Sequence, residues 1–272
     1  MIIKEYRWAM PLSLDEYEKG QRYSVSKSSL NETGGGQGVE ILKSEPFESD
    51  TLRPGQNMKG TYTHKIYHLY KKAPWFMRKM LPEAFFNVEE ESWNAFPYSK
   101  TVITNPEYMG KDFYAIIETI HTEEDVINDN ALNLNPDLLK GREVIYLDIY
   151  DETHLKPNDI TPETNPRVFR SIRAGFEPLT QGWAIHVEPR IIVYKSVQVY
   201  FKWFGLQNRV ERYFHKSYPR LFMKFNREMI CWIDEWIHLS DVELDNYERD
   251  ALAQLRRNFA EGQIRGMKAA DE

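Results

Sequence analysis

Two lysines interrupt strand patterns that are otherwise typical of a packed core. The first is Lys65, within Gly60-Thr-Tyr-Thr-His-Lys-Ile-Tyr-His-Leu69. Alternation puts one set of side chains on the same face of this predicted strand: Thr61, Thr63, Lys65, Tyr67 and Leu69. If that face points inward, the ammonium needs an anion or several acceptors, because an unpaired buried charge is strongly unfavourable. The alternative is a lysine whose stem packs while its head reaches water.

The second lysine is Lys195, in Ile191-Ile-Val-Tyr-Lys-Ser-Val-Gln-Val-Tyr-Phe-Lys-Trp203, the most β-prone run of the chain. One face of this strand is apolar apart from the lysine: Ile191, Val193, Lys195, Val197, Val199, Phe201 and Trp203. The other face is expected to be wetter and holds Tyr194, Ser196, Gln198 and Lys202. Two strands that each direct a lysine into an apolar surface indicate one anionic ligand in a hydrophobic cavity. Such a site favours a phospholipid or fatty-acid binder over a catalyst of polar substrates.

An acidic residue lies on the apolar side of the last predicted helix. Ser240-Asp-Val-Glu243 is a capping box, which marks the start of that helix. Its apolar stripe contains Leu244, Tyr247, Ala251, Leu252, Leu255 and Phe259. Glu248 is four residues from both Leu244 and Leu252, so it falls on the same stripe. We therefore expect a third charge that faces inward.

Other chemistry has little support. His64 and His68 would suit zinc on a helix, but on a strand they stand about 13 Å apart, too far for one metal. Cys231 lies between Ile230 and Trp232, which predicts a buried, inert thiol. The chain contains no Gly-x-Ser-x-Gly elbow. We therefore expect no metal, no cofactor and no catalytic residues.

Composition narrows the class of protein further. The 272 residues include 35 basic and 41 acidic ones, a net charge of −6, which argues against a nucleic-acid binder. A single cysteine excludes an internal disulfide and fits a reducing compartment. The start of the chain has no signal-peptide pattern, and no uncharged apolar run is long enough to span a membrane. We expect a soluble, cytoplasmic protein whose attraction to membranes comes from local patches.

The elements that must position these residues follow from the pattern along the chain. Strands are expected at Ile2–Met10, Val39–Lys43, 60–69, Ser99–Thr104, Phe113–Ile120, Glu143–Tyr150 and 191–204. Helices are expected from Ser13 to about Ser28, after Gly205 with an interruption near Pro219, and after Ser240. The segments 44–59 and 151–185 are predicted to be loops, the second one exposed. The glycine cluster Asn31–Gly38 is predicted to be a mobile turn. This order predicts one α+β domain, with a largely antiparallel sheet wrapped around long helices and enclosing a single cavity.

A short amphipathic segment, Ala73–Pro82, is bounded by prolines and contains Trp75 and Phe76 next to the Arg78-Lys79 pair. A core helix and a loop that dips into a membrane surface are both consistent with it.

Longer motifs resemble those of the class I phosphatidylinositol transfer proteins. They are Lys4-Glu-Tyr-Arg7, Asp15-Glu-Tyr17, Asn31-Glu-Thr-Gly-Gly-Gly-Gln-Gly-Val39, Tyr62-Thr-His-Lys-Ile-Tyr-His-Leu69, Trp93-Asn-Ala-Phe-Pro-Tyr98, Phe201-Lys-Trp-Phe-Gly-Leu-Gln207 and Arg265-Gly-Met267. They occur in order from the first strand to the tail. The resemblance implies a START-like fold around one phospholipid. It also implies non-enzymatic exchange of phosphatidylinositol and phosphatidylcholine between membranes, supplying phosphoinositide signalling and its kinases, by a monomer that meets membranes transiently.

The resemblance also implies roles for particular residues. The headgroup contacts would be Thr63, Lys65, Asn94, Glu248, Gln21, Thr101, Thr119 and Lys195. Phe225 and Met229 would line the acyl-chain cavity. Trp203, Phe204, Trp75 and Phe76 would dock on the membrane. The last helix and tail, about 240–272, would form a lid.

The chain departs from the family pattern at three places. Phe204 replaces the second of two tryptophans, Ser99 replaces a common cysteine, and Pro106 is an insertion. Regulation by phosphorylation of Ser171 is a hypothesis, because the segment 151–185 matches less well. Two alternatives remain: a carrier of phosphatidic acid or another lipid, and a START-like enzyme with Glu248 as base.

Overall fold

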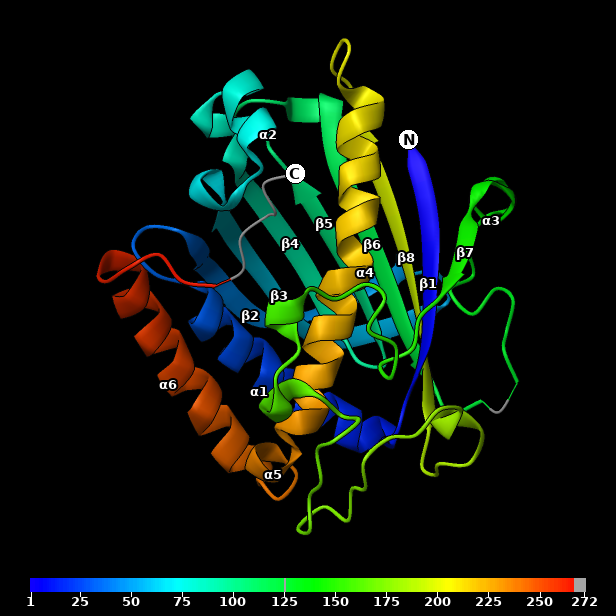
Figure 1. Cartoon of the computed structure of the whole chain (residues 1–272). Coiled ribbons are helices and arrows are strands. Elements are labelled where there is room, and N and C mark those ends of the chain that lie inside the picture. The colour runs from blue at the N-terminus through cyan, green and yellow to red at the C-terminus, as the bar shows by residue number, and fades with distance from the viewer. Residues whose placement is uncertain (125, 267–272) are drawn as a thin grey trace.

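The computed structural model describes residues 1–124 and 126–266 and forms a twisted sheet with helices packed on one side (Figure 1). The strands of this eight-stranded sheet, within the described ranges, are β1 (Ile2–Met10), β2 (Gly38–Arg53), β3 (Gln56–His68), β4 (Asn87–Ala95), β5 (Tyr98–Thr104), β6 (Phe113–Thr122), β7 (Glu143–Tyr146) and β8 (Ile191–Phe201). They lie in the order β2-β3-β4-β5-β6-β8-β1-β7. Every neighbouring pair is antiparallel except β1 with β7. The α+β class and the largely antiparallel sheet are confirmed.

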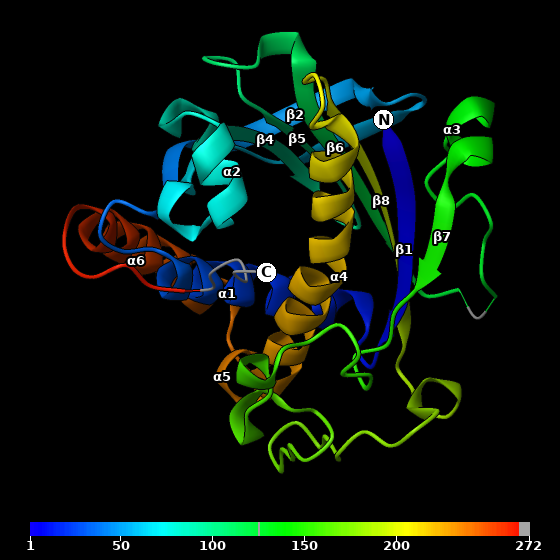
Figure 2. The same cartoon turned by 45° about the horizontal axis from the view of Figure 1, so that its top comes forward.

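The long helices pack on one side of the sheet. The helices are α1 (Leu14–Glu32), α2 (Trp75–Met80), α3 (Pro136–Gly141), α4 (Gln207–Cys231), α5 (Ile233–Trp236) and α6 (Asp241–Ala260). The predicted capping boxes at Ser13 and Ser240 open α1 and α6. α4 packs on β8 and β1, α1 lies between α4 and α6, and α6 packs on α1 and also contacts β2 (Figures 1 and 2). We call the sheet face under α1 and α4 the inner face. The main core lies between this face and the two helices.

α4 runs through Pro219 without a break, so the predicted interruption was wrong. Proline has no N–H, and the helical carbonyl it leaves without a donor is that of His215. The hydroxyl of Tyr6 on β1 donates to that carbonyl at 3.2 Å. A side chain from the sheet therefore satisfies the acceptor that the proline leaves unpaired.

The segment 44–59 was predicted to be a loop, and this was wrong. β2 extends to Arg53 and β3 begins at Gln56, so the two strands form a long hairpin with a tight turn. Most side chains between Lys43 and Lys59 are exposed on both faces of the hairpin. The hairpin therefore lacks the apolar alternation by which a half-buried strand is recognised.

β4 was not predicted, because a run of three glutamates suggests a solvated segment. On the strand the three carboxylates alternate between faces. Those of Glu89 and Glu91 point outward and bond His64 at 3.0 Å and Tyr62 at 2.6 Å. Glu90 points to the inner face, opposite Lys65.

The face of β8 that was predicted to be wetter is buried along the strand, which corrects the expectation, although Lys202, just after the strand, is exposed as expected. Tyr194 and Ser196 have no exposed surface, and Gln198 is 6% exposed. Residues between β6 and β7 cover this outer face: Leu132 and Leu134 pack with Tyr194. A covering loop distant in sequence cannot be read from the strand's own pattern. The predicted strand Glu143–Tyr150 is also shorter and ends at Tyr146.

The segment 151–185 is irregular as predicted, with three-residue 3-10 turns, but it is not simply exposed. Arg220 of α4 binds Asp159 through two nitrogen atoms, at 2.6 and 2.8 Å. Arg227, also on α4, donates to Asn165 at 2.8 Å. Ser171, on the same segment, is 2% exposed. The segment is therefore anchored to α4 by charged side chains.

Candidate functional site

The register of the sheet aligns several predicted site residues on the inner face. One row crosses six strands: Thr61, Asn94, Ser99, Thr119, Lys195 and Tyr6. The next row contains Thr63, Ser92 and Thr101, and the third contains Lys65 and Glu90. Neighbouring strands are about 4.8 Å apart and neighbouring rows about 7 Å. Six of the predicted headgroup residues therefore form one patch, which we call the polar rows.

The solvent exposure of the side chains increases along the polar rows. Thr119 is 2% exposed, whereas Asn94, two strands away in the same row, is solvent-exposed. Between them, the hydroxyls of Ser92 and Thr101 are 3.0 Å apart and hydrogen-bonded. The patch therefore offers hydroxyl and amide groups from the sheet interior toward its β3 side.

Lys195 lies at the buried end of the polar rows. Burial lowers the pKa of this ammonium to about 8, against a smaller opposing effect of the Glu90 carboxylate. Its Nζ atom is 5.2 Å from the centre of the Phe222 ring on α4. An anion placed here would gain a strong partner, because the local environment weakens the hydration of the cation.

Lys65 has a partner that the sequence did not reveal. Its Nζ atom lies 3.2 Å from a carboxylate oxygen of Glu90, and both side chains are about 85% covered, at 15% and 13% exposed. Burial, followed by the charge of the Glu90 carboxylate, raises the pKa of Tyr67. Glu90 thus belongs to the site. The alternation of Glu89, Glu90 and Glu91 on a strand is the signal that could have identified it.

Three polar side-chain atoms near the polar rows have no hydrogen-bond partner among the described residues: Trp8 Nε1, Ser24 Oγ and His121 Nε2. Burial lowers the pKa of His121 to about 3, so the ring is neutral. Its Nδ1 donates to the carbonyl of Pro97 at 2.9 Å, which leaves Nε2 as an acceptor. Buried polar groups are normally satisfied, so these atoms fit a polar ligand better than a closed core.

Two predicted headgroup residues come from helices. Gln21 is partly buried on α1, one turn after Tyr17. Because the Tyr17 ring lies 4.6 Å from that of His121, this side of α1 faces the polar rows. Glu248 lies elsewhere, at the interface of α1 and α6, where it forms an ion pair with Arg22 at 2.6 Å.

The predicted acyl-chain residues lie on α4. Met229 is fully buried in the main core, and Phe225 is partly buried against it. Their place under the sheet is compatible with an apolar lining.

The predicted docking residues gather where α2 and the loop before α4 lie at the same end of the molecule (Figure 1). Phe204 is fully exposed and Trp75 is 49% exposed. Phe76 instead lies 4.0 Å from the Arg209 guanidinium, and Trp203 stacks on Tyr108 at 5.9 Å. Two of the four rings therefore expose apolar surface, while the other two pack against neighbouring side chains.

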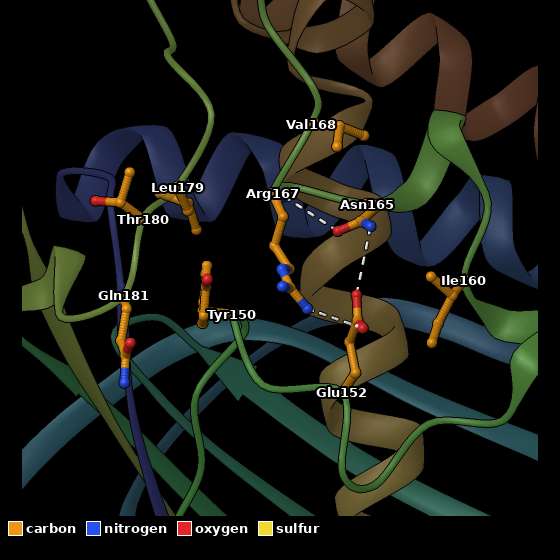
Figure 3. A pocket seen from close by; sticks show the side chains of 9 residues that line it. All are labelled: Tyr150, Glu152, Ile160, Asn165, Arg167, Val168, Leu179, Thr180 and Gln181. Atoms are coloured by element: carbon orange, nitrogen blue, oxygen red, sulfur yellow. Dashed lines mark hydrogen bonds and ion pairs between the residues drawn. The ribbon is translucent and has the colours of Figure 1, made fainter.

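A hollow of about 500 Å³ lies outside the polar rows, within the irregular segment 150–181 (Figure 3). Arg167 reaches across it to Glu152 at 2.9 Å and lies over the ring of Tyr150 at 4.6 Å. An internal ion pair fills its polar side, so we do not assign it to the ligand.

In the described part of the chain, side chains suited to metal binding or nucleophilic catalysis do not form a site. Within 1–124 and 126–266, no set of three or more metal-binding side chains is close enough to hold an ion. Burial raises the pKa of Cys231 to about 12, which makes it a poor nucleophile. No helix in those ranges has the length and apolar character that a bilayer span requires.

One face of the sheet carries hydroxyls, an amide and two lysines, and a helix places aromatic rings opposite them. This arrangement is that of an α+β protein that binds an amphiphile. Residues 1–253 match the family described as phosphatidylinositol transfer protein. The chain is 40% identical over 276 residues to the phosphatidylinositol transfer protein beta isoforms of Bos taurus and Homo sapiens, covering 100% of this chain and 99% of each relative. It is 37% identical over 263 residues to phosphatidylinositol transfer protein 1 of Dictyostelium discoideum, covering 96% of this chain and 97% of that protein. The chain belongs to the phosphatidylinositol transfer protein family.

Proposed function

We propose that this protein is a non-enzymatic carrier that holds one phosphatidylinositol or phosphatidylcholine molecule in a START-like enclosure and exchanges it between membranes. The observation that carries the proposal is the set of polar rows with Lys195 at its buried end. The family membership supports it, since the relatives are named for phosphatidylinositol transfer.

The enclosure is supported by side chains that combine two properties. Burial dominates the pKa shifts of Lys195 and Tyr67, yet both residues keep part of their surface accessible. Side chains that line an internal cavity behave in this way. The acyl chains of a lipid need such a cavity, because moving each CH₂ group from an apolar environment into water costs about 0.8 kcal/mol.

The polar rows suit a lipid headgroup. Lys195, with the hydroxyls of Thr119 and Thr101 nearby, can bind a phosphodiester as a point charge plus donors. Thr63, Lys65 and Asn94 can exchange hydrogen bonds with inositol hydroxyls. Each lost pairing costs about 1–3 kcal/mol, which favours inositol over a headgroup without donors.

We propose that α6 and the tail act as the lid. The glycine turn, Gly34–Gly36, contacts the end of α6: the N–H groups of Gly35 and Gly36 donate to the carbonyls of Asn258 and Phe259, at 3.3 and 2.9 Å. These bonds satisfy carbonyls that a helix end leaves unpaired. The last six residues of the predicted tail, 267–272, lie outside the described residues.

Docking on a membrane would use the end of the molecule that carries Phe204 and Trp75. Both rings have apolar surface in water, and Arg78 and Lys79 of α2 are exposed beside them. Aromatic rings with flanking cations suit the bilayer interface. We propose that the protein acts as a monomer in the cytoplasm, meets membranes transiently and supplies inositol lipid to phosphoinositide kinases.

The test is transfer of labelled phosphatidylinositol between vesicles, after which the lipid is recovered and its molecular mass is determined by mass spectrometry. Wild type should move intact lipid, and Lys65→Ala should reduce inositol-lipid transfer. Lys100→Ala, on the outer face of β5, is the matched control and should transfer normally. If wild type moves no phosphatidylinositol, the proposal fails. Recovery of chemically altered lipid would favour the alternative of an enzyme. Preferential transfer of phosphatidic acid would favour the alternative of a phosphatidic acid carrier.

A further inference from the structure

The C-terminus of α1 is bound by a lysine that lies 40 residues later in the chain. α1 ends at Glu32 and has no basic residue in its last turn. The Nζ atom of Lys72 donates to the main-chain carbonyl of Glu32 at 2.6 Å and lies 3.1 Å from its carboxylate. Lys72 is 8% exposed. A cation here satisfies a carbonyl at the helix end and complements the helix dipole, so Lys72 is held against α1.

Lys72 is also the last residue of a short 3-10 turn, η1 (Tyr70–Lys72), that leads into α2. Two residues separate it from Trp75, the half-exposed ring at the proposed docking end. The N–H of the preceding residue, Lys71, donates to the side-chain oxygen of Gln37 at 2.9 Å. Two consecutive residues therefore fasten the start of α2 to the end of α1 and to the glycine turn.

The carboxylate that binds Lys72 also contacts the tail. A Cβ atom added at Gly266 would overlap the Oε2 atom of Glu32, so glycine leaves the space that the carboxylate occupies. Gly266 has a φ of +82°, which also favours glycine. Glu32 therefore lies between the start of α2 and the tail, in contact with both.

The glycine turn makes a parallel connection to α6. The amide of Gln37 donates to the carbonyl of Gly36 at 2.8 Å, while its oxygen accepts from Lys71. The N–H of Gly36 in turn donates to the carbonyl of Phe259, in the last turn of α6, at 2.9 Å. A chain of hydrogen bonds thus runs from the start of α2 through the turn to the end of α6.

We propose that Lys72 is a positioning residue for lipid exchange: its bonds to Glu32, which we call the latch, hold the tail and the end of α6 closed until α2 moves on a membrane. This inference rests on the proposed carrier function. The three residues from Lys72 to Trp75 span at most about 10 Å, so a shift of α2 with its ring into the bilayer pulls the ammonium away from Glu32.

Breaking the latch releases the tail. A carboxylate that loses its cation favours water, so Glu32 turns away from Gly266 and the tail separates from α1. Opening is then tied to docking. Acyl chains meet water at a cost that rises with every CH₂ group, so a carrier that opens at the bilayer avoids this cost.

The first experiment measures amide hydrogen exchange in residues 257–266, with and without phosphatidylcholine vesicles. Wild type should exchange slowly in water and faster with vesicles. Lys72→Met should exchange about tenfold faster in water and gain little from vesicles, because the latch is already broken. Lys71→Met is the matched control, since its side chain is exposed and its main-chain bond to Gln37 is retained. Slow exchange of Lys72→Met in water, or a full response to vesicles, would overturn the inference.

Two further variants separate the latch from a general loss of stability. Lys72→Arg keeps the charge and should return the tail to nearly the wild-type rate. Adding Glu32→Gln to Lys72→Met should loosen the tail no further, because both changes break one contact. Fast exchange in Lys72→Arg, additive effects, or equally faster exchange in the buried strand β8 would each contradict the latch.

A change in the tail tests the coupling from the other side, and does so even if Lys72→Met fails to fold. Gly266→Ala displaces the Glu32 carboxylate, so exchange around residues 70–75 should become faster, since coupling between two sites is reciprocal. Gly262→Ala is the control: its φ of +98° brings similar backbone strain, but the added atom meets nothing within 4 Å. Equal exchange at 70–75 in the two variants would exclude the latch.

Lipid transfer between vesicles distinguishes failure of this inference from failure of the carrier function. If wild type transfers no lipid but vesicles open its tail in a manner that depends on Lys72, the carrier function fails and the latch stands. If transfer is normal and the tail of Lys72→Met exchanges as slowly as that of wild type, the latch fails alone.

Discussion

Arg22 of α1 binds Glu248 of α6 through two nitrogen atoms. Its Nε lies 3.1 Å from one carboxylate oxygen and its Nη2 lies 2.6 Å from the other, and Nη2 also bonds Asp245 at 2.6 Å. Side-chain hydrogen bonds to these carboxylates raise the pKa of the guanidinium, so Arg22 keeps its charge. The charge predicted to face a ligand is therefore also the charge that joins the proposed lid to α1.

Replacement of Arg22 by glutamine should loosen α6. Arg22 is 28% exposed and Glu248 35% exposed, so solvent screening limits the pair to about 1 kcal/mol. We expect amide hydrogen exchange in α6 to become several-fold faster, because local opening costs less. Arg249→Gln is the control, since its guanidinium is exposed and bonds Asn246 in its own helix. Unchanged exchange in α6 would show that the apolar contacts alone hold it.

A substitution in the glycine turn gives a second test of the lid, because the steric clash it would cause is defined by the structure. A Cβ atom added at Gly34 would lie 2.4 Å from the carbonyl oxygen of Gln263, so main-chain atoms would have to move. Gly34→Ala should therefore displace residues 262–266 and make them more sensitive to proteolysis, with faster lipid exchange. Gly141→Ala, where the added atom meets nothing within 4 Å, should leave both properties unchanged. Equal protease resistance in the two variants would exclude the turn as a lid contact.

Part of this arrangement was predictable from the sequence, for an identifiable reason. Lys65 and Lys195 were found because one charge in an apolar alternating strand breaks a local pattern. Their location on one sheet face was confirmed by the strand register, although the headgroup roles remain predictions.

The features that sequence reasoning missed depend on contacts distant in the chain. Glu90 was hidden in a run of glutamates, and only the pairing of β3 with β4 shows which of them faces Lys65. The continuity of α4 through Pro219 depends on a donor from Tyr6, 213 residues earlier in the chain. Neither contact leaves a local periodicity, so no window of sequence contains the information.

Lys195 predicts a particular dependence of stability on pH. Its pKa is lowered from 10.5 to about 8 in the folded protein, so between these values the unfolded chain binds more protons. The free energy of unfolding contributed by this group therefore rises as the pH increases from about 8 toward 10.5. Lys195→Met, which keeps the length of the side chain, removes this contribution.

Urea unfolding of wild type and Lys195→Met at about pH 7 and about pH 10 measures the effect. We expect Lys195→Met to be the more stable protein near neutral pH and the advantage to shrink at the higher pH. A constant difference would mean that the ammonium is not desolvated. Loss of the positive charge should also weaken phosphodiester binding above about pH 8 in wild type, and vesicle transfer should fall accordingly.

Ser171 lies where an added negative charge would act on the anchoring of the irregular segment. Its hydroxyl donates to the carboxylate of Asp234 in α5, and Ser171 and Phe176 exchange two main-chain hydrogen bonds of 2.9 Å. Because the side chain is 2% exposed, a kinase could reach it only after this turn opens. A phosphate or a glutamate there would face Asp234, and like charges at this distance repel strongly when partly buried.

Ser171→Glu should therefore release the segment around residue 171 and reduce lipid transfer. Ser171→Ala removes only the two hydrogen bonds of the hydroxyl, to Asp234 and from the N–H of Ala174, and should cost about 2 kcal/mol of stability. Ser49→Glu, in the exposed β2–β3 hairpin, is the control for an added charge. Asp234→Asn combined with Ser171→Glu should restore part of the transfer, because it removes the repelling partner. Normal transfer by Ser171→Glu would rule out a phosphorylation switch at this position. Reduced transfer without rescue by Asp234→Asn would instead assign the effect to the size of the new side chain, because charge repulsion requires both carboxylates.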